Sequence, residues 1–150
     1  MTNKYRTSLV LGLAITLCAV MTAGESFAAE INWETIPGQA QAAAMQSNKP
    51  LLVYVGASYC GYCKKLEQTT WSNRGVARMV ETNFVPLKLD SQRNADIARQ
   101  LRVRAFPTVI VLSPDGHLLA RNDGYVDARA MASFLTRSTR DAATRTSYKR

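Results

Sequence analysis

The fold is decided by the stretch LLVYVGASYCGYC, which occupies residues 51–63. Its first five residues form a continuous apolar run directly after Pro50, and this length and composition are typical of a strand buried on both faces. Residues 56–59 then predict a turn, and a helix is expected to begin at about Cys60. Two cysteines, Cys60 and Cys63, are therefore predicted in the first turn of a helix that follows a buried strand.

The spacing of Cys60 and Cys63 favours chemistry over stability. A disulfide that closes so short a loop removes little entropy from the unfolded chain. A thiol attacks only as its thiolate, and the unpaired N–H groups and partial positive charge of a helix N-terminus favour that anion. We therefore expect Cys60 to be an exposed nucleophile and Cys63, on the same side of the turn, to be the thiol that resolves a mixed disulfide.

Other uses of the cysteine pair are less well supported. A structural zinc site needs four ligands, and His117 is the only further His or Cys outside residues 1–28, so no metal site is expected. An inert buried pair fits poorly with a preceding strand and turn. A binding module that holds Cu(I) between the two soft thiolates stays open as the alternative to an enzyme. No cofactor is expected beyond a redox-active disulfide between Cys60 and Cys63.

The first 28 residues have the pattern of a secretory signal peptide. Lys4 and Arg6 precede an uncharged apolar run over residues 9–23, which is shorter than the about 20 residues of a membrane-spanning helix. Residues 26–28, Ser-Phe-Ala, offer the small side chains that a signal peptidase requires. We expect a cleaved leader over residues 1–28 and a periplasmic location, with an uncleaved membrane anchor as the alternative.

Composition indicates one ordinary globular domain. Loss of residues 1–28 removes Cys18 and leaves 122 of the 150 residues, enough for a hydrophobic core, with the net charge falling from +8 to +7. Residues 137–150 are polar and basic without an apolar period, and we expect a flexible tail there, after a domain over residues 29–136. No aromatic platform or binding motif accompanies these charges, so no nucleic-acid role is expected; an adhesive role for the cationic surface stays open.

Strands and helices alternate along the chain. Helices are expected from about residue 60 and over residues 37–47, 73–82, 95–101 and 127–135, and strands over residues 51–55, 84–90, 108–112 and 118–121, with a leading strand or extended arm over residues 31–35. This order predicts an α/β fold, with a mixed sheet between helical layers and a hairpin at its end. Pro86, inside one of the strands, favours an irregular or an edge position along part of that strand.

With the cysteine motif in this place, the chain resembles the thioredoxin superfamily over about residues 33–135. The resemblance is carried by residues 51–64, by FVPLKLD at residues 84–90 and by VRAFPT at residues 103–108. It implies a thioredoxin-like three-layer fold, with a central mixed β-sheet flanked by helices. It also implies thiol–disulfide oxidoreductase activity that uses the cysteine pair itself.

The resemblance also assigns roles to the residues around the dithiol. Most X-Pro bonds are trans, but the resemblance implies a cis Phe106–Pro107 bond beside the two sulfurs. The backbone of Phe106 would then pair with an extended substrate. Tyr59 replaces the usual tryptophan before the first cysteine and is expected to help orient the substrate.

One departure from the family pattern concerns proton transfer. Tyr54 stands where thioredoxins carry a buried aspartate, so the usual proton acceptor for Cys63 is missing. Glu67, one helical turn after Cys63, resembles a glutamate in the C-terminal domain of the bacterial transmembrane thiol reductant carrier. Two interpretations stay open: Glu67 exchanges a proton with Cys63, or it is a solvated side chain paired with a lysine such as Lys64 or Lys65.

These features predict a monomeric periplasmic enzyme that exchanges disulfides with protein thiols, with net reduction favoured. Its expected partners are client proteins and an upstream redox protein, such as a membrane thiol reductant carrier. The Gly61-Tyr62 dipeptide also resembles the periplasmic disulfide isomerases, so an isomerase is an alternative. Those isomerases dimerise through an N-terminal domain that we do not expect in this chain, and reduction is therefore preferred.

Overall fold

The computed structural model describes residues 30–148. The predicted leader over residues 1–28 lies outside these residues. Within the described part of the chain, no helix is both long and apolar enough to cross a membrane.

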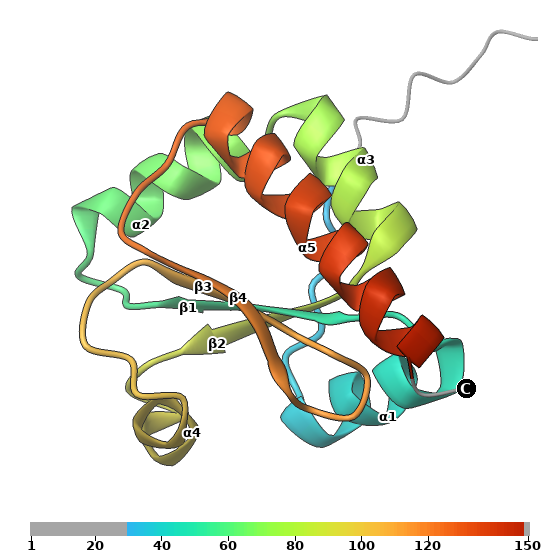
Figure 1. Ribbon diagram of the computed structural model, residues 1–150. Coiled ribbons are helices and arrows are strands. Elements are labelled where there is room, and N and C mark those ends of the chain that lie inside the picture. The colour runs from blue at the N-terminus through green and yellow to red at the C-terminus, as the bar shows by residue number, and fades with distance from the viewer. Residues whose placement is uncertain (1–29, 149–150) are drawn as a thin grey trace, which may run out of the picture.

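A four-stranded mixed sheet forms the centre of the molecule (Figure 1). Its strands are β1 (Leu51–Gly56), β2 (Val85–Asp90), β3 (Thr108–Leu112) and β4 (Leu118–Asp123), and their spatial order is β2-β1-β3-β4. Strand β1 pairs in parallel with β2 and antiparallel with β3, and β3 pairs antiparallel with β4. The predicted mixed sheet, with its hairpin at the end, is confirmed.

Strand β2 lies at the edge of this sheet, which is one of the two positions that Pro86 favours. Beyond it the N-terminal arm adds a single bridge, in which the N–H of Glu34 donates to the carbonyl of Pro86 at 2.9 Å and the N–H of Lys88 donates to the carbonyl of Glu34 at 2.9 Å. Proline has no N–H for a ladder, so the arm pairs with Pro86 through its carbonyl alone. The extended arm expected over residues 31–35 therefore covers the edge next to the middle of β2.

Helices cover both faces of the sheet, which gives three layers (Figure 1). The helical elements are α1 (Pro37–Ser47), α2 (Gly61–Leu66), the π-helical segment η1 (Glu67–Trp71), α3 (Arg74–Asn83), α4 (Ala95–Gln100) and α5 (Ala128–Tyr148). Helices α1 and α4 lie on one side of the sheet and α3 and α5 on the other, while α2 extends from the end of β1. This is the predicted arrangement of a central sheet between helical layers.

The alternation of side chains along β1 builds a core on each face of the sheet. Leu52 and Tyr54 are fully buried in the cluster that packs beneath η1, α3 and α5. Val53 and Val55 are buried in the cluster on the other face, beneath α1 and α4. A strand buried on both faces is what the apolar run over residues 51–55 predicts.

The last helix is longer than predicted. The expected end at residue 135 is too early, because α5 continues to Tyr148, through most of the segment that we expected to be a flexible basic tail. Ser138 continues the buried stripe of Met131 and Leu135, and its hydroxyl donates to the carbonyl of Phe134 at 2.9 Å. Ser138 extends the packed face of the helix although it is not an apolar residue, so the hydrophobic pattern of the sequence does not reveal it. Residues 139–150 contain no glycine or proline that would end a helix.

Candidate functional site

The two cysteines lie where β1 gives way to α2, as the sequence predicts. Cys60 is the N-cap of α2, and its sulfur accepts a hydrogen bond from the N–H of Cys63 at 3.0 Å. The N–H of Cys60 itself donates to the carbonyl of Ala57 at 3.1 Å, which closes the preceding turn. The N-cap position therefore aims a backbone donor at the Cys60 sulfur, and that donor stabilises a thiolate there.

Cys60 and Cys63 form a disulfide, with Cα atoms 5.2 Å apart. Cys60 is partly exposed, whereas Cys63 is only 3% exposed. A partner can therefore reach the first sulfur but not the second. This asymmetry matches the expected division between an attacking and a resolving cysteine.

The Phe106–Pro107 loop lies at the same end of the sheet. Thr108, the first residue of β3, pairs with Val55 of β1, so Pro107 is level with the point where β1 leads into the dithiol turn. The Phe106–Pro107 peptide bond is cis. The carbonyl of Pro107 accepts from the N–H of Gly124 at 2.7 Å.

The backbone of Phe106 is open to a partner. No backbone hydrogen bond in the described part of the chain engages its N–H or its carbonyl, whereas the flanking carbonyls of Ala105 and Pro107 are both occupied. The Phe106 side chain packs against the core cluster beneath α1 and α4. Its ring is therefore an anchor, and its free backbone groups suit the addition of an extended peptide.

Exposed tyrosines flank the dithiol. Tyr59 is 70% exposed and Tyr62 is 63% exposed, although both are large aromatic side chains. The ring of Tyr62 lies 6.3 Å from that of Tyr125, which comes from the loop after β4 and carries Lys65 over its face at 4.5 Å. Tyr62 and Tyr125 were not predicted as site residues. Tyr62 lies inside the cysteine motif, but no local signal marks Tyr125, which only the tertiary fold brings to Tyr62.

Glu67 lies one turn beyond Cys63, at the junction of α2 and η1. Its Oε1 atom accepts a hydrogen bond from the Tyr54 hydroxyl at 3.1 Å and lies 2.8 Å from the Lys88 Nζ atom. Neither Lys64 nor Lys65 is its ion-pair partner. The π turn begins at this residue, since the N–H of Ser72 donates to the Glu67 carbonyl at 3.2 Å, and such turns are frequent at functional sites.

Tyr54 occupies the position expected for a buried carboxylate and is fully buried. Burial raises the pKa of its hydroxyl above the ordinary value, and the charge of Glu67 and the hydrogen bond to it raise the pKa further. The hydroxyl therefore stays protonated at physiological pH and donates to Glu67. Tyr54 is not itself the missing proton acceptor, but it holds the residue that could serve as one.

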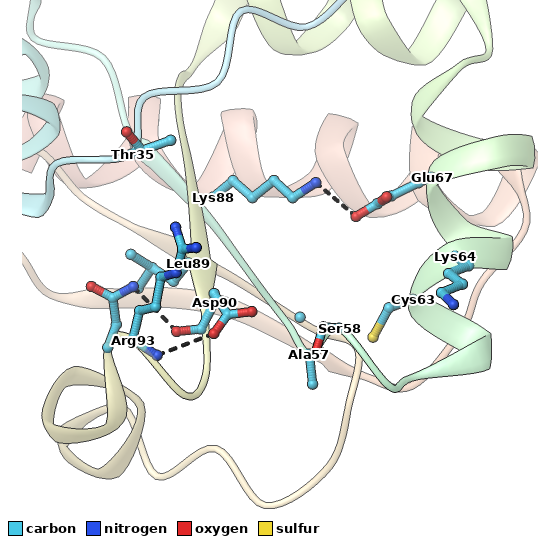
Figure 2. Close-up of a pocket in the computed structure, with 12 residues that line it drawn as sticks. Thr35, Ala57, Ser58, Cys63, Lys64, Glu67, Lys88, Leu89, Asp90 and Arg93 are labelled. Atoms are coloured by element: carbon cyan, nitrogen blue, oxygen red, sulfur yellow. Dashed lines mark hydrogen bonds and ion pairs between the residues drawn. The ribbon is translucent and has the colours of Figure 1, made fainter.

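A pocket of about 530 Å³ joins the resolving cysteine to this glutamate. Cys63 and Glu67 line it from the helix side, and Gly56, Lys88 and Asp90 line it from the sheet. Figure 2 shows Cys63 and Glu67 projecting into the same hollow, with Lys88 reaching Glu67 from β2. The resolving sulfur and the carboxylate therefore share one pocket, which is large enough to hold water.

The described residues hold no group of three or more His, Cys, Asp or Glu side chains that could bind a metal ion.

Comparison with known proteins gives one family and a consistent fold. A model of the thioredoxin-like domain family matches residues 37–138, which include all four strands and the dithiol. The thiol:disulfide interchange protein DsbD of Cronobacter sakazakii is 32% identical over 107 residues, which are 67% of this chain and 18% of that protein. The chain spans 16% and 8% of the lengths of the first curated relatives that it matches.

Two solved structures show the same fold. The DsbH oxidoreductase has a TM-score of 0.68 at 20% identity, over 75% of this chain and 87% of that one. A thioredoxin from Thermus thermophilus has a TM-score of 0.69 at 24% identity, over 75% of this chain and 90% of that one. A fold of this kind with a Cys-x-x-Cys disulfide at the end of β1 supports thiol–disulfide oxidoreductase chemistry.

Proposed function

Because the chain belongs to the thioredoxin-like domain family, we propose that it is a thiol–disulfide oxidoreductase whose main direction is the reduction of client disulfides. The observation that carries the proposal is the pairing of a partly exposed Cys60, at the N-cap of α2, with a buried Cys63. Such a pair attacks with one sulfur and resolves with the other.

The reaction begins with the reduced enzyme. The Cys60 thiolate attacks one sulfur of a client disulfide, forms a mixed disulfide and releases the second client sulfur as a thiolate, which takes up a proton. Cys63 then loses its proton, and its sulfur attacks the Cys60 sulfur and displaces the client's remaining thiolate. Two electrons have moved from the enzyme dithiol to the client disulfide, and a dithiol donor must reduce the Cys60–Cys63 disulfide again.

Client binding is proposed to use the Phe106–Pro107 loop and the exposed tyrosines. The unpaired N–H and carbonyl of Phe106 hydrogen-bond to an extended segment of the client. Tyr59 and Tyr62 offer apolar surface on either side of Cys60. This mode recognises backbone and apolar side chains around a disulfide, and so suits many unfolded or partly folded client proteins.

Reduction is favoured over oxidation by the surroundings of the Cys60 sulfur. Strong oxidants of this type stabilise their reduced form, and a nearby imidazolium stabilises a thiolate. The only histidine of the chain, His117, lies in the β3–β4 turn next to Asp115 and not beside the dithiol. The described residues give the Cys60 sulfur one hydrogen bond, from Cys63, so its thiolate is modestly stabilised.

The test is a reduction assay joined to a redox titration. The protein without its leader should accelerate the reduction of insulin by dithiothreitol, and its equilibrium with glutathione should give a potential well below about −150 mV. A potential above that value would show an oxidant. Repair of scrambled disulfides without net reduction of insulin would favour the isomerase alternative, and no dithiol reactivity at all would refute the enzyme.

We also propose that the protein works in the periplasm, with a membrane thiol reductant carrier as its electron donor. The proposal rests on the charge and apolar pattern of residues 1–28 and on the similarity to DsbD proteins. In a cell expressing the full chain, fractionation should recover a shortened form with the periplasmic proteins. Recovery of the full-length form with the cytoplasmic proteins would contradict the proposal.

A further inference from the structure

Three side chains from three elements meet beside the resolving cysteine. Tyr54 of β1 and Lys88 of β2 are direct partners in the parallel ladder, and both contact the Oε1 atom of Glu67. The Lys88 Nζ atom also lies over the Tyr54 ring, 5.7 Å from its centroid. The carboxylate is thus held from the sheet by a neutral donor and a cation, while its own helix turn carries Cys63.

The absence of a side chain at Gly56 leaves room for the Tyr54 hydroxyl. A Cβ atom at Gly56 would lie 2.9 Å from the hydroxyl oxygen, so any other residue there would push the ring away. The ring itself packs against Trp33 and Trp71, with centroids 5.7 and 5.9 Å away. Packing in the core therefore fixes the direction of the Tyr54 hydroxyl. The ammonium group of Lys88, on a partly exposed side chain, is not fixed in this way.

We propose that Tyr54 is a positioning residue for proton transfer, whose hydroxyl holds the Glu67 carboxylate at the wall of the pocket that contains Cys63. This inference rests on the proposed oxidoreductase function. The Cys63 thiol passes its proton to Glu67, directly or through one water, as its sulfur attacks the Cys60 sulfur. The displaced client thiolate carries away the electron pair of the broken bond and later takes up a proton.

Tyr54 and Lys88 differ in how they hold the Glu67 carboxylate. Glu67 is 41% exposed, so without a fixed partner its carboxylate is free to turn to solvent. Lys88 is equally exposed and has a long flexible stem, so it supplies charge but little direction. Tyr54 is the rigid member, because its ring is fully buried.

The test is a double-mutant cycle on the second step of the reaction. A preformed mixed disulfide between Cys60 and a labelled peptide is mixed into buffer, and release of the peptide is followed by stopped flow. Tyr54→Phe should slow release by roughly 3- to 10-fold at neutral pH, the effect of one lost orienting hydrogen bond. In the Glu67→Gln background the same substitution should change the rate by less than about twofold, because an amide that Tyr54 holds in place still cannot take the proton.

The pH profile separates positioning from a merely structural role. The Tyr54→Phe rate should converge on the wild-type rate at alkaline pH, where hydroxide deprotonates Cys63 without help. The titratable or charged side chains that contact Glu67 or line its two pockets are Tyr54, Lys88, Asp90, Arg93, Glu30, Cys63 and Lys64, and all but Tyr54 are kept in this variant. A uniform slowing at every pH would instead indicate a packing defect and overturn the inference.

The control is Thr70→Val, because Thr70 is also fully buried and does not line the pocket. This substitution removes the hydroxyl that donates to the carbonyl of Val126 at 2.8 Å. It should leave the release rate unchanged. Equal effects of Tyr54→Phe in both backgrounds, or none in either, would overturn the inference while leaving the proposed function intact. Failure of the wild-type protein to form or resolve any mixed disulfide would refute the proposed function itself.

Discussion

Replacing Cys60 by serine should abolish disulfide reduction and leave the fold unchanged. A hydroxyl is not ionised near neutral pH, so the N-cap donor from Cys63 has no anion to stabilise and the first attack cannot occur. Serine is also a preferred N-cap residue, so α2 should begin at the same place. Insulin reduction should fall to the rate of dithiothreitol alone, with circular dichroism and thermal unfolding close to those of the reduced wild-type protein.

Its companion, Cys63→Ala, should behave differently. The first attack still occurs, because Cys60 is untouched, but no sulfur is present to displace the client. The variant should therefore accumulate mixed disulfides, which are visible on non-reducing gels and identifiable by mass spectrometry in cells. Equal insulin reduction by wild type and Cys60→Ser would contradict the catalytic assignment. The absence of any trapped client with Cys63→Ala would contradict the assignment of Cys63 as the resolving cysteine.

Replacing Glu67 by glutamine should slow the release of a client from the mixed disulfide by about 100-fold at neutral pH, the lower range for loss of a general base. Glutamine keeps the shape of the side chain and still accepts a hydrogen bond from Tyr54, but it cannot take the proton of the buried Cys63 thiol. The rate should recover at alkaline pH, because more Cys63 is then ionised without assistance from a carboxylate.

The measurement is again the release of a labelled peptide, recorded from acid to alkaline pH. Glu81→Gln is the matched control, since Glu81 is an exposed carboxylate that accepts from the N–H of Asn32 at 2.7 Å, away from the dithiol pocket. It should leave the rate unchanged. An unaltered rate and profile in Glu67→Gln would show that Cys63 loses its proton to solvent, and that the Glu67 contacts serve stability alone.

Local patterns in the sequence predicted the elements well where burial and turn chemistry agree. The apolar run after Pro50 became β1, and the prolines at residues 37 and 86 marked a helix start and an edge strand. The end of α5 was not predictable in this way. Ser138 is buried because α5 packs against α3, and a serine in sequence looks like a surface residue.

The ion-pair partner of Glu67 could not be predicted from the sequence for a different reason. Lys64 and Lys65 are its neighbours in sequence, and helix spacing alone offers them as ion-pair partners. The structure instead pairs it with Lys88, because β1 and β2 place Tyr54 and Lys88 side by side beneath the helix. A pairing between a helix and two strands depends on sheet order and register, neither of which leaves a local signal.

The place of the redox chemistry could be read from the sequence, because neighbours in the chain put the two cysteines between a buried strand and the start of a helix. The depth at which Cys63 is buried, and the groups that surround its sulfur, depend on the tertiary structure. Burial and the contacts of Glu67 arise from the parallel register of β1 with β2 and the packing of α2 above them, which join residues far apart in the chain.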